Sequence, residues 1–327
     1  MAVRMSFTSR ATSAIGVPRR DARHRASPRQ RVRWTRAGPL AGSFEDEHRG
    51  TGWRHRGRTA PIPCVIDIGV NLTDHAFDGD RAAVLARARD AGVDTLIVTG
   101  TTLRHSEEAL VLARSPAACR LFTTAGVHPH HARDWSDDVA RGLATLLREP
   151  EVVAVGETGL DFFRDLSPRP AQERAMEAQL ALAAQTGRPV FLHARGAADR
   201  FLAILRAHRD RFPGGVLHCF TESSEVLHDC LDLGLCIGIT GWICDERRGG
   251  ELAALVGAIP DDRLLIETDA PYLLPRTLRP RPKTRRNEPQ WLTAVCAEVA
   301  RLRGVAAEHV ARVTTENAHR LFRLVDG

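Results

Sequence analysis

Ionisable side chains end several apolar runs of this 327-residue chain. Glu157 follows the run VVAVG that begins at Val152, and His193 and His218 each end a short apolar run. A carboxylate or imidazole in a buried segment is costly unless a partner or a metal ion compensates it. One carboxylate and two imidazoles form a three-ligand set that leaves a position open for water or substrate. These three residues therefore predict a divalent metal site.

Asp269, His128 and Asp67 occupy comparable positions at or near the ends of other apolar runs. We predict that Asp269 approaches the same site, and that His128 contacts substrate or water at the metal. A single histidine of this kind is more often a satisfied core residue. Several such groups at the same relative position in different runs favour a functional site instead.

The elements that must position these residues are eight apolar runs of strand length that alternate with segments of helical periodicity. The predicted strands span 64–70, 94–100, 121–127, 152–161, 189–194, 215–220, 236–240 and 264–269. The predicted helices span 78–91, 104–114, 136–148, 170–186, 197–208, 223–233, 250–256, 288–303 and 306–324. Alternation of this kind predicts an α/β fold in which eight parallel strands close into a (β/α)8 TIM barrel, whose catalytic groups follow the carboxyl ends of the strands. A doubly wound open sheet is the alternative.

The charge of the chain is unevenly distributed. Residues 1–60 contain fourteen Arg and only four acidic residues, whereas the whole chain has a net charge of +6, so residues 61–327 are slightly acidic. We expect residues 61–327 to form one barrel domain and residues 1–60 to be a leader outside it. A disordered basic tail, a transit peptide, and upstream sequence read from too early a start remain open for the leader. No run is long enough to span a bilayer.

A basic stretch follows the eighth predicted strand, on the side of a barrel where catalytic loops lie. Residues 275–286 contain six basic residues, including Arg285 and Arg286, and no acidic residue, and Arg247 and Arg248 lie in the preceding loop. We predict that these four arginines contact substrate phosphate, although a solvated charge run is the alternative. Aromatic residues also follow strand ends, where they could stack on bases or pack a lid: Phe162, Phe163, Trp242 and Tyr272.

Several motifs resemble the TatD family of metal-dependent deoxyribonucleases, over about residues 64–324. They are DIGVNL (67–72), TAGVHPH (124–130), VGETGLDF (155–162), PVFLH (189–193), LHCFT (217–221), GITGW (238–242), DERRG (245–249), LIETDAPY (265–272) and RRNEP (285–289). The resemblance implies a TIM barrel of the amidohydrolase type and 3′-to-5′ exonuclease action on single-stranded DNA, and also on RNA. It also implies metal-binding roles for Glu157, His193 and His218, with Asp269 as a ligand or general base.

The first strand departs from most of the wider family, which has a His-x-His pair that helps to hold a second metal. Gly69 and Asn71 stand at those positions. Asn71 offers only a neutral carbonyl, which suits a hard ion such as Mg²⁺. We expect a divalent metal cofactor, with Mg²⁺ as the first candidate and Mn²⁺ or Zn²⁺ as alternatives. We also expect a weaker second ion near Asp269, Asn71 and Asp67.

The leading hypothesis is a metal-dependent nuclease. The alternatives are a hydrolase of small amides, esters or phosphotriesters, because the fold does not determine the substrate, and a nucleic-acid-binding protein with a degenerate site. Seven scattered cysteines without a C-x-x-C motif indicate free thiols in the cytoplasm. We expect a monomer with no membrane partner.

Overall fold

The computed structural model describes residues 64–324. The expected leader, residues 1–60, lies outside the described residues. The first described residue, Cys64, directly precedes the first strand.

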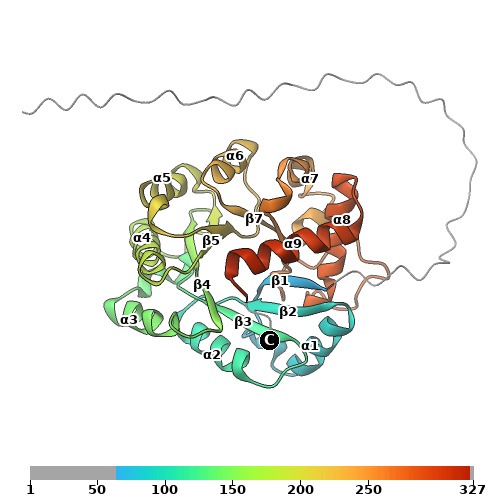
Figure 1. The fold of residues 1–327 in the computed structure, drawn as a ribbon, viewed down its shortest axis with the longest axis horizontal. Helices are drawn as coiled ribbons and strands as arrows, with labels where there is room; N and C mark the ends of the chain where they lie inside the picture. Colours follow the sequence, from blue (N-terminus) through green and yellow to red (C-terminus); the bar gives the residue numbers. More distant parts are fainter. Residues whose placement is uncertain (1–63, 325–327) are drawn as a thin grey trace, which may run out of the picture. The chain divides into compact units, whose positions relative to one another are not determined.

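Eight parallel strands pair in sequence order, as predicted, and helices surround them (Figure 1). The strands are β1 (Val65–Val70), β2 (Val93–Val98), β3 (Arg120–Ala125), β4 (Val152–Asp161), β5 (Val190–Arg195), β6 (Gly215–Leu217), β7 (Cys236–Ile239) and β8 (Leu264–Ile266). The ends of the sheet approach each other just beyond β8. There, the Asp269 amide donates to the Gly69 carbonyl, and the Asn71 amide donates to the Ala270 carbonyl, each at 2.8 Å. The sheet is therefore a nearly closed barrel.

The connections are mostly helical, and the predicted helices are all present. They are α1 (Arg81–Asp90), α2 (Leu103–Arg114), α3 (Asp137–Leu146), α4 (Arg169–Thr186), α5 (Ala198–His208), α6 (Ser224–Asp232), α7 (Gly250–Leu255), α8 (Leu292–Arg303) and α9 (Ala307–Phe322). Short 3₁₀ helices extend several of them. Gly187 ends α4 in the left-handed conformation that favours glycine.

The sixth and eighth strands are shorter than the sequence predicts. β6 ends at Leu217 and β8 at Ile266, whereas the predicted strands continue to residues 220 and 269. The chain leaves the ladder because Cys219 and Asp269 adopt positive φ angles of 47° and 52°, which an extended strand does not tolerate. His218 and Asp269 thus lie on the turns that follow these strands rather than within the sheet.

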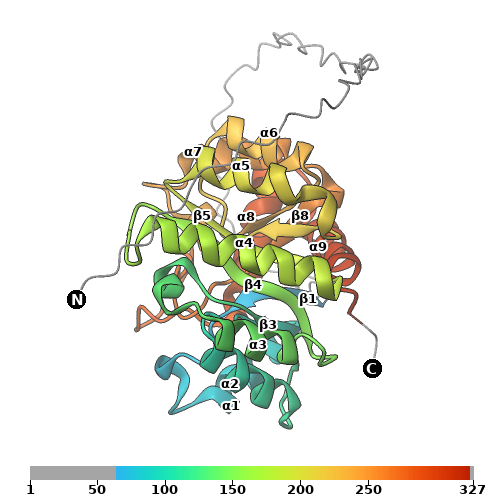
Figure 2. The same cartoon turned by 90° about the vertical axis from the view of Figure 1, so that its left-hand side faces the viewer.

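Two hydrophobic clusters hold the barrel together. One lies between the strands and the surrounding helices, and the other fills the barrel interior with residues such as Ile68 and Phe191. Phe322 of α9 joins the interior cluster, and Asn317 of α9 donates to the Leu264 carbonyl at the start of β8. Helix α9 therefore covers the amino-terminal end of the strands, as the side view in Figure 2 illustrates. The carboxyl ends of the strands remain open to form a site.

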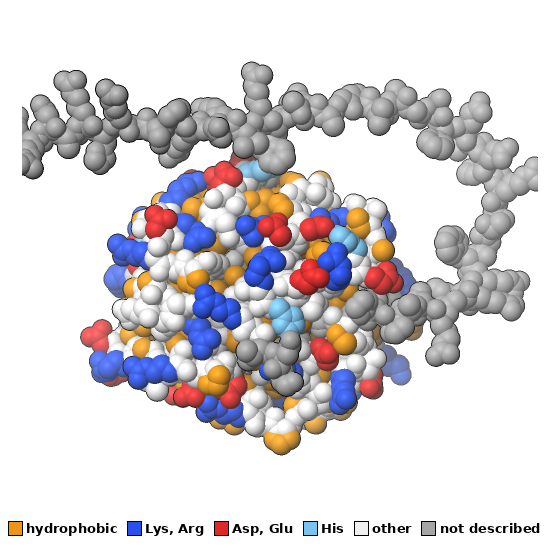
Figure 3. All heavy atoms as spheres, in the orientation of Figure 1, with side chains coloured by type: hydrophobic (Ala, Val, Ile, Leu, Met, Phe, Trp, Pro, Cys, Tyr) orange, Lys and Arg blue, Asp and Glu red, His pale blue; other side chains and the backbone are white. Residues whose placement is uncertain are grey.

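The face that bears α9 has basic and acidic side chains interspersed over its visible part (Figure 3). None of the helices between residues 64 and 324 combines the length and the apolar character that a bilayer crossing requires.

Candidate active site

Glu157 lies at the centre of the open end of the barrel. It is near the carboxyl end of β4, and only 5% of its surface is exposed. Gly156 precedes it with a φ of +138°, and a Cβ at that position would lie 2.2 Å from the Phe191 carbonyl oxygen of β5. Only glycine fits where the two strands approach so closely. This contact helps to fix the direction of the Glu157 side chain.

Three imidazoles surround one oxygen of this carboxylate. The Oε1 atom of Glu157 lies 2.9 Å from Nδ1 of His193, 2.7 Å from Nε2 of His218 and 3.3 Å from Nε2 of His128. The structure thus brings together side chains from β4, from β5 and from the turns after β3 and β6. Ligand atoms of His128, Glu157 and His193 all lie within 4.8 Å of one another, which is compatible with a metal ion.

A second carboxylate stands behind each of two imidazoles. Nε2 of His193 lies 3.5 Å from Oδ2 of Asp161, and Nδ1 of His218 lies 3.4 Å from Oε2 of Glu267. Both distances exceed those of good hydrogen bonds, and both imidazole nitrogens lack another hydrogen-bond partner among residues 64–324. Carboxylates that face the outer nitrogen of a histidine are typical supports of metal-ligating imidazoles.

These two supporting carboxylates were not among the predicted site residues. Asp161 ends β4, and Glu267 directly follows β8, so their position at strand ends was the available signal. His130 was likewise left without a role, and its Nε2 lies 2.8 Å from Oδ2 of Asp161. The sequence places these residues near the site, but it does not reveal which imidazole each one faces.

The pKa values follow from burial opposed by charge. Burial acts to raise the pKa of Glu157, but the imidazoles of His218 and His128 outweigh it and hold the pKa well below its usual range. Burial acts to lower the pKa values of His193 and His218, but neighbouring carboxylates outweigh it. Asp161 and Glu157 raise the pKa of His193. Glu157 and Glu267 raise the pKa of His218 well above its ordinary value. The carboxylates of the centre therefore favour positive charge at the positions of His193 and His218.

His128 differs from the other two imidazoles in its hydrogen bonds. Burial lowers its pKa to about 4, so the ring is neutral near pH 7. Its Nδ1 accepts a hydrogen bond from the His130 amide at 3.1 Å. A neutral imidazole with an accepting Nδ1 has its proton on Nε2. The Nε2 atom then faces Glu157 as a donor, not as a lone pair available to a metal.

Asp269 lines the same cavity and is held by Asn71. The Asn71 amide nitrogen donates to Oδ1 of Asp269 at 2.8 Å. Burial raises the pKa of Asp269 to about 7, against the opposing charge of His218. This carboxyl group can therefore exchange a proton near neutral pH.

Asp67 does not lie with Asn71 and Asp269 at the cavity, which departs from the expectation of a shared second metal position. Its side chain is fully buried, and Oδ1 accepts hydrogen bonds from the Thr268 amide at 2.9 Å and the Gly69 amide at 3.3 Å. The Thr268 hydroxyl donates to Oδ2. Burial raises the pKa of Asp67 to about 7. These contacts make Asp67 a link between β1 and the chain after β8.

A large cavity of about 1950 Å³ opens above these residues. Ligand sites for drug-sized molecules typically have about 300–1,000 Å³. This cavity has room for a polymeric substrate. Its walls contain the predicted residues Asn71, His128, Glu157, His193, His218, Arg248, Asp269 and Arg285, together with Asp161 and Trp242.

Of the four arginines predicted to contact phosphate, only Arg248 and Arg285 line this cavity. Arg247 does not line this cavity, and its guanidinium is paired with Asp245. Its Nε and Nη2 atoms donate to Oδ1 and Oδ2 of Asp245, each at 3.3 Å. The guanidinium carbon of Arg248 lies 5.8 Å from the centre of the Trp242 ring.

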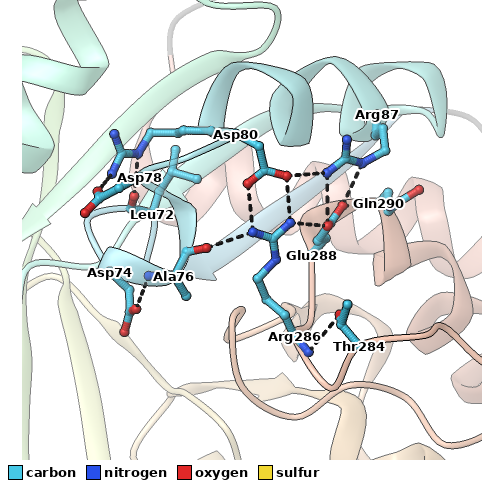
Figure 4. Close-up of polar contacts among 11 residues, drawn as sticks. Leu72, Asp74, Ala76, Asp78, Asp80, Arg87, Thr284, Arg286, Glu288 and Gln290 are labelled. Atoms are coloured by element: carbon cyan, nitrogen blue, oxygen red, sulfur yellow. Dashed lines mark hydrogen bonds and ion pairs between the residues drawn. The ribbon is translucent and has the colours of Figure 1, made fainter.

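Arg286 is the clearest correction to the prediction. Its guanidinium donates to both oxygens of Asp80, at 2.7 and 2.8 Å, to Glu288 at 2.7 Å and to the Ala76 carbonyl at 2.7 Å. Arg87 of α1 completes the network through Glu288 and Asp80, as Figure 4 shows. The charge of Arg286 is neutralised here, so the residue anchors the loop after β8 to the start of α1.

Comparisons with known protein sequences identify the family of the chain. The family model described as TatD related DNase matches residues 66–323. A protein of Edwardsiella piscicida named 3′-5′ ssDNA/RNA exonuclease TatD is 57% identical over 261 residues, which cover 80% of this chain and 100% of the relative. A protein of the same name from Klebsiella pneumoniae strain 342 is 54% identical over 79% of this chain and 97% of the relative.

A similar structure has also been solved. The TatD homolog YJJV of Escherichia coli K12 superimposes with a TM-score of 0.72 at 32% sequence identity, over 80% of this chain and 98% of that protein. The chain belongs to the family of TatD-related DNases.

Proposed function

We propose that this protein is a metal-dependent nuclease that removes nucleotides from the 3′ end of single-stranded DNA and RNA. The observation that supports this most directly is the convergence of His193 and His218 on one oxygen of Glu157 beneath a large cavity. The names of relatives that are 54–57% identical agree with this activity.

Glu157, His193 and His218 are the residues that we propose to hold the metal ion. Their donor set fits a divalent cation, because two imidazoles and a carboxylate converge and a further carboxylate supports each imidazole. Imidazole ligands favour Zn²⁺ here, whereas Mg²⁺ and Mn²⁺ prefer oxygen ligands such as those that Asp269 and Asn71 offer. When bound, such a cation offsets the charge of a phosphate and lowers the pKa of water.

The surrounding residues supply the remaining chemistry. Asp269 accepts the proton of the attacking water, since its raised pKa of about 7 makes it a stronger base than an ordinary aspartate. The Nε2–H group of His128 faces Oε1 of Glu157 and helps to hold this carboxylate in position. Arg248 and Arg285 on the cavity wall neutralise phosphate charge.

The test uses 5′-labelled and 3′-labelled single-stranded DNA and RNA with Mg²⁺, Mn²⁺ or EDTA. Exonuclease action from the 3′ end shortens the 5′-labelled strand stepwise and releases the 3′ label as a mononucleotide at once. The Glu157→Gln variant should lose this activity and its bound metal while it keeps the circular dichroism of the barrel. Full activity in EDTA, or turnover of small esters or amides but not of nucleic acid, would refute the proposal.

We also propose a monomeric enzyme of the cytoplasm, in which residues 61–327 form the catalytic domain. All seven cysteines are free in the structure, which fits a reducing compartment. Light scattering of the purified full-length chain would test the monomer, because a dimer would double the measured mass.

A further inference from the structure

A second cavity lies beside the active-site cavity and shares part of its wall. It has a volume of about 440 Å³. Trp242, Arg248, Leu273 and Arg285 line both cavities, so the two spaces are neighbours across these four residues. The chemistry described above does not use this second cavity.

Part of the wall of the second cavity is apolar. Trp242 lies on the 3₁₀ helix Gly241–Cys244 after β7, and Leu274, Pro275 and Pro282 come from the loop after β8. The two loops touch at Gly241, where a Cβ would lie 2.0 Å from the Leu273 carbonyl oxygen. Only glycine permits this close approach, which places the Trp242 ring against the loop after β8.

Four arginines and one carboxylate, that of Asp245, also line this cavity. Among residues 64–324, no ion pair forms to Arg248, Arg281 or Arg285, although all three line the cavity. Arg276 also lines it but is paired with Glu246. Three free guanidinium groups around an apolar, partly aromatic wall match a nucleotide, which joins a flat base to a charged phosphate.

We propose that this second cavity is a subsite for a nucleotide of the substrate strand, upstream of the nucleotide that is cleaved. The base stacks on Trp242, and the adjoining phosphates lie against Arg281 and Arg285. The inference rests on the proposed nuclease function and deepens it. It implies that the substrate is a single strand of several nucleotides, because a base that is paired and stacked in a double helix would not be available to enter the cavity.

Binding in EDTA tests the subsite without any turnover. Fluorescence anisotropy would give the Kd of the full-length protein for 5′-labelled oligonucleotides with one abasic residue at each of the four positions nearest the 3′ end. Loss of one stacked base should raise the Kd roughly 5- to 100-fold at a single upstream position. In Trp242→Ala, that same position should become insensitive to the abasic substitution, since the two changes remove one contact.

Arginine variants provide a matched comparison on one loop. Arg281→Ala should reduce the slope of log K against log salt by about 0.7, which is the contribution of one phosphate contact to a single strand. Arg279→Ala is the control, because the Arg279 guanidinium donates to the carbonyls of Arg276 and Leu278 and does not line either cavity. Its salt slope should equal that of the wild type.

The outcomes separate this inference from the proposed function. If the abasic penalty is the same in the wild type and in Trp242→Ala at every position, or if Arg279→Ala and Arg281→Ala change the salt slope equally, the subsite is refuted even if hydrolysis continues. Hydrolysis of labelled DNA by the same preparations is measured separately. If no hydrolysis occurs, the proposed nuclease function is refuted, whereas the binding data still show whether the subsite exists.

Discussion

Arg285 and Arg286 are neighbours in the sequence, yet the structure predicts opposite effects when each is replaced by alanine. Arg286 is paired with Asp80 and Glu288 and bonds to the Ala76 carbonyl, whereas Arg285 is exposed and lines the cavities. We expect Arg286→Ala to destabilise the fold. We expect Arg285→Ala to leave stability unchanged and to weaken binding of single-stranded DNA.

The size of the Arg286 effect follows from its contacts. Removal of this guanidinium leaves two carboxylates with only Arg87 as a shared cation. Breaking a fully buried pair costs about 3–5 kcal/mol, but Asp80 is partly exposed, so solvent reduces the loss. We therefore expect a decrease of about 2–3 kcal/mol in the free energy of unfolding. In a domain of this size, that corresponds to a decrease in Tm of roughly 4–12 °C. Arg285→Ala should stay within about 0.5 kcal/mol of the wild type.

The assay combines urea unfolding with double-mutant cycles. Asp80→Ala and Arg286→Ala should be non-additive by at least about 1 kcal/mol, since they remove the two ends of one interaction. Asp80→Ala and Arg285→Ala should be additive within about 0.5 kcal/mol. Anisotropy with a labelled oligonucleotide then measures the DNA affinity of the Arg285 variant at several salt concentrations.

One pattern would refute the reasoning. If Arg286→Ala unfolded at the same urea concentration as the wild type and reduced the salt dependence of DNA binding as much as Arg285→Ala, Arg286 would be a phosphate contact after all. The network with Asp80 and Glu288 would then not persist in solution.

Three further predictions concern the site and the thiols. Asp161→Asn should weaken metal binding about 10- to 100-fold in calorimetric titration, because it removes the carboxylate behind His193, while the exposed Asp165→Asn should have no effect; equal affinities in the two variants would contradict this support role. The Asp269 carboxyl should titrate near pH 7 in ¹³C NMR of the metal-free protein and at lower pH with a divalent cation, because burial raises its pKa and a nearby positive charge lowers it; a titration near pH 4 without metal would contradict the burial argument. Native protein should show one fast-reacting thiol, that of the exposed Cys64, and seven reactive thiols after denaturation. The less exposed Cys219 should react slowly, because burial raises its pKa to about 12. A second fast-reacting thiol would show that the loops around the site open.

The sequence predicts most of the barrel because its strands are buried on both faces. Strands such as β4 are continuous apolar runs, and glycines mark several helix ends, so the eight-fold alternation is plain without any knowledge of contacts. The same logic predicts that Glu157, His193 and His218 meet, since the carboxyl ends of neighbouring parallel strands lie at one end of a barrel. The ends of β6 and β8 were too long in the prediction, because hydrophobicity does not reveal a left-handed turn at Cys219 or Asp269.

The sequence does not reveal which distant side chains pair with each other. Arg286 meets Asp80 across 206 positions, and a basic run gives no sign of which member is already neutralised. Asp67 resembled a site residue because it is a carboxylate near a strand end, but its oxygens face the amides of Gly69 and Thr268. In each case, the local pattern shows that a charge is present, and only the tertiary structure shows what compensates it.

The turns after β6 and β8 separate the functional groups from the elements that provide stability. His218 and Asp269 lie one to three residues beyond ladders that end at Leu217 and Ile266. These two ionisable side chains can therefore lie near the charged Glu157 without interrupting the hydrogen bonds between the strands. The carboxylates of Glu157 and Glu267 are buried at the site, and a bound cation offsets the free-energy cost of their burial. The chemistry at the open end of the barrel can change through the loops without a change of fold.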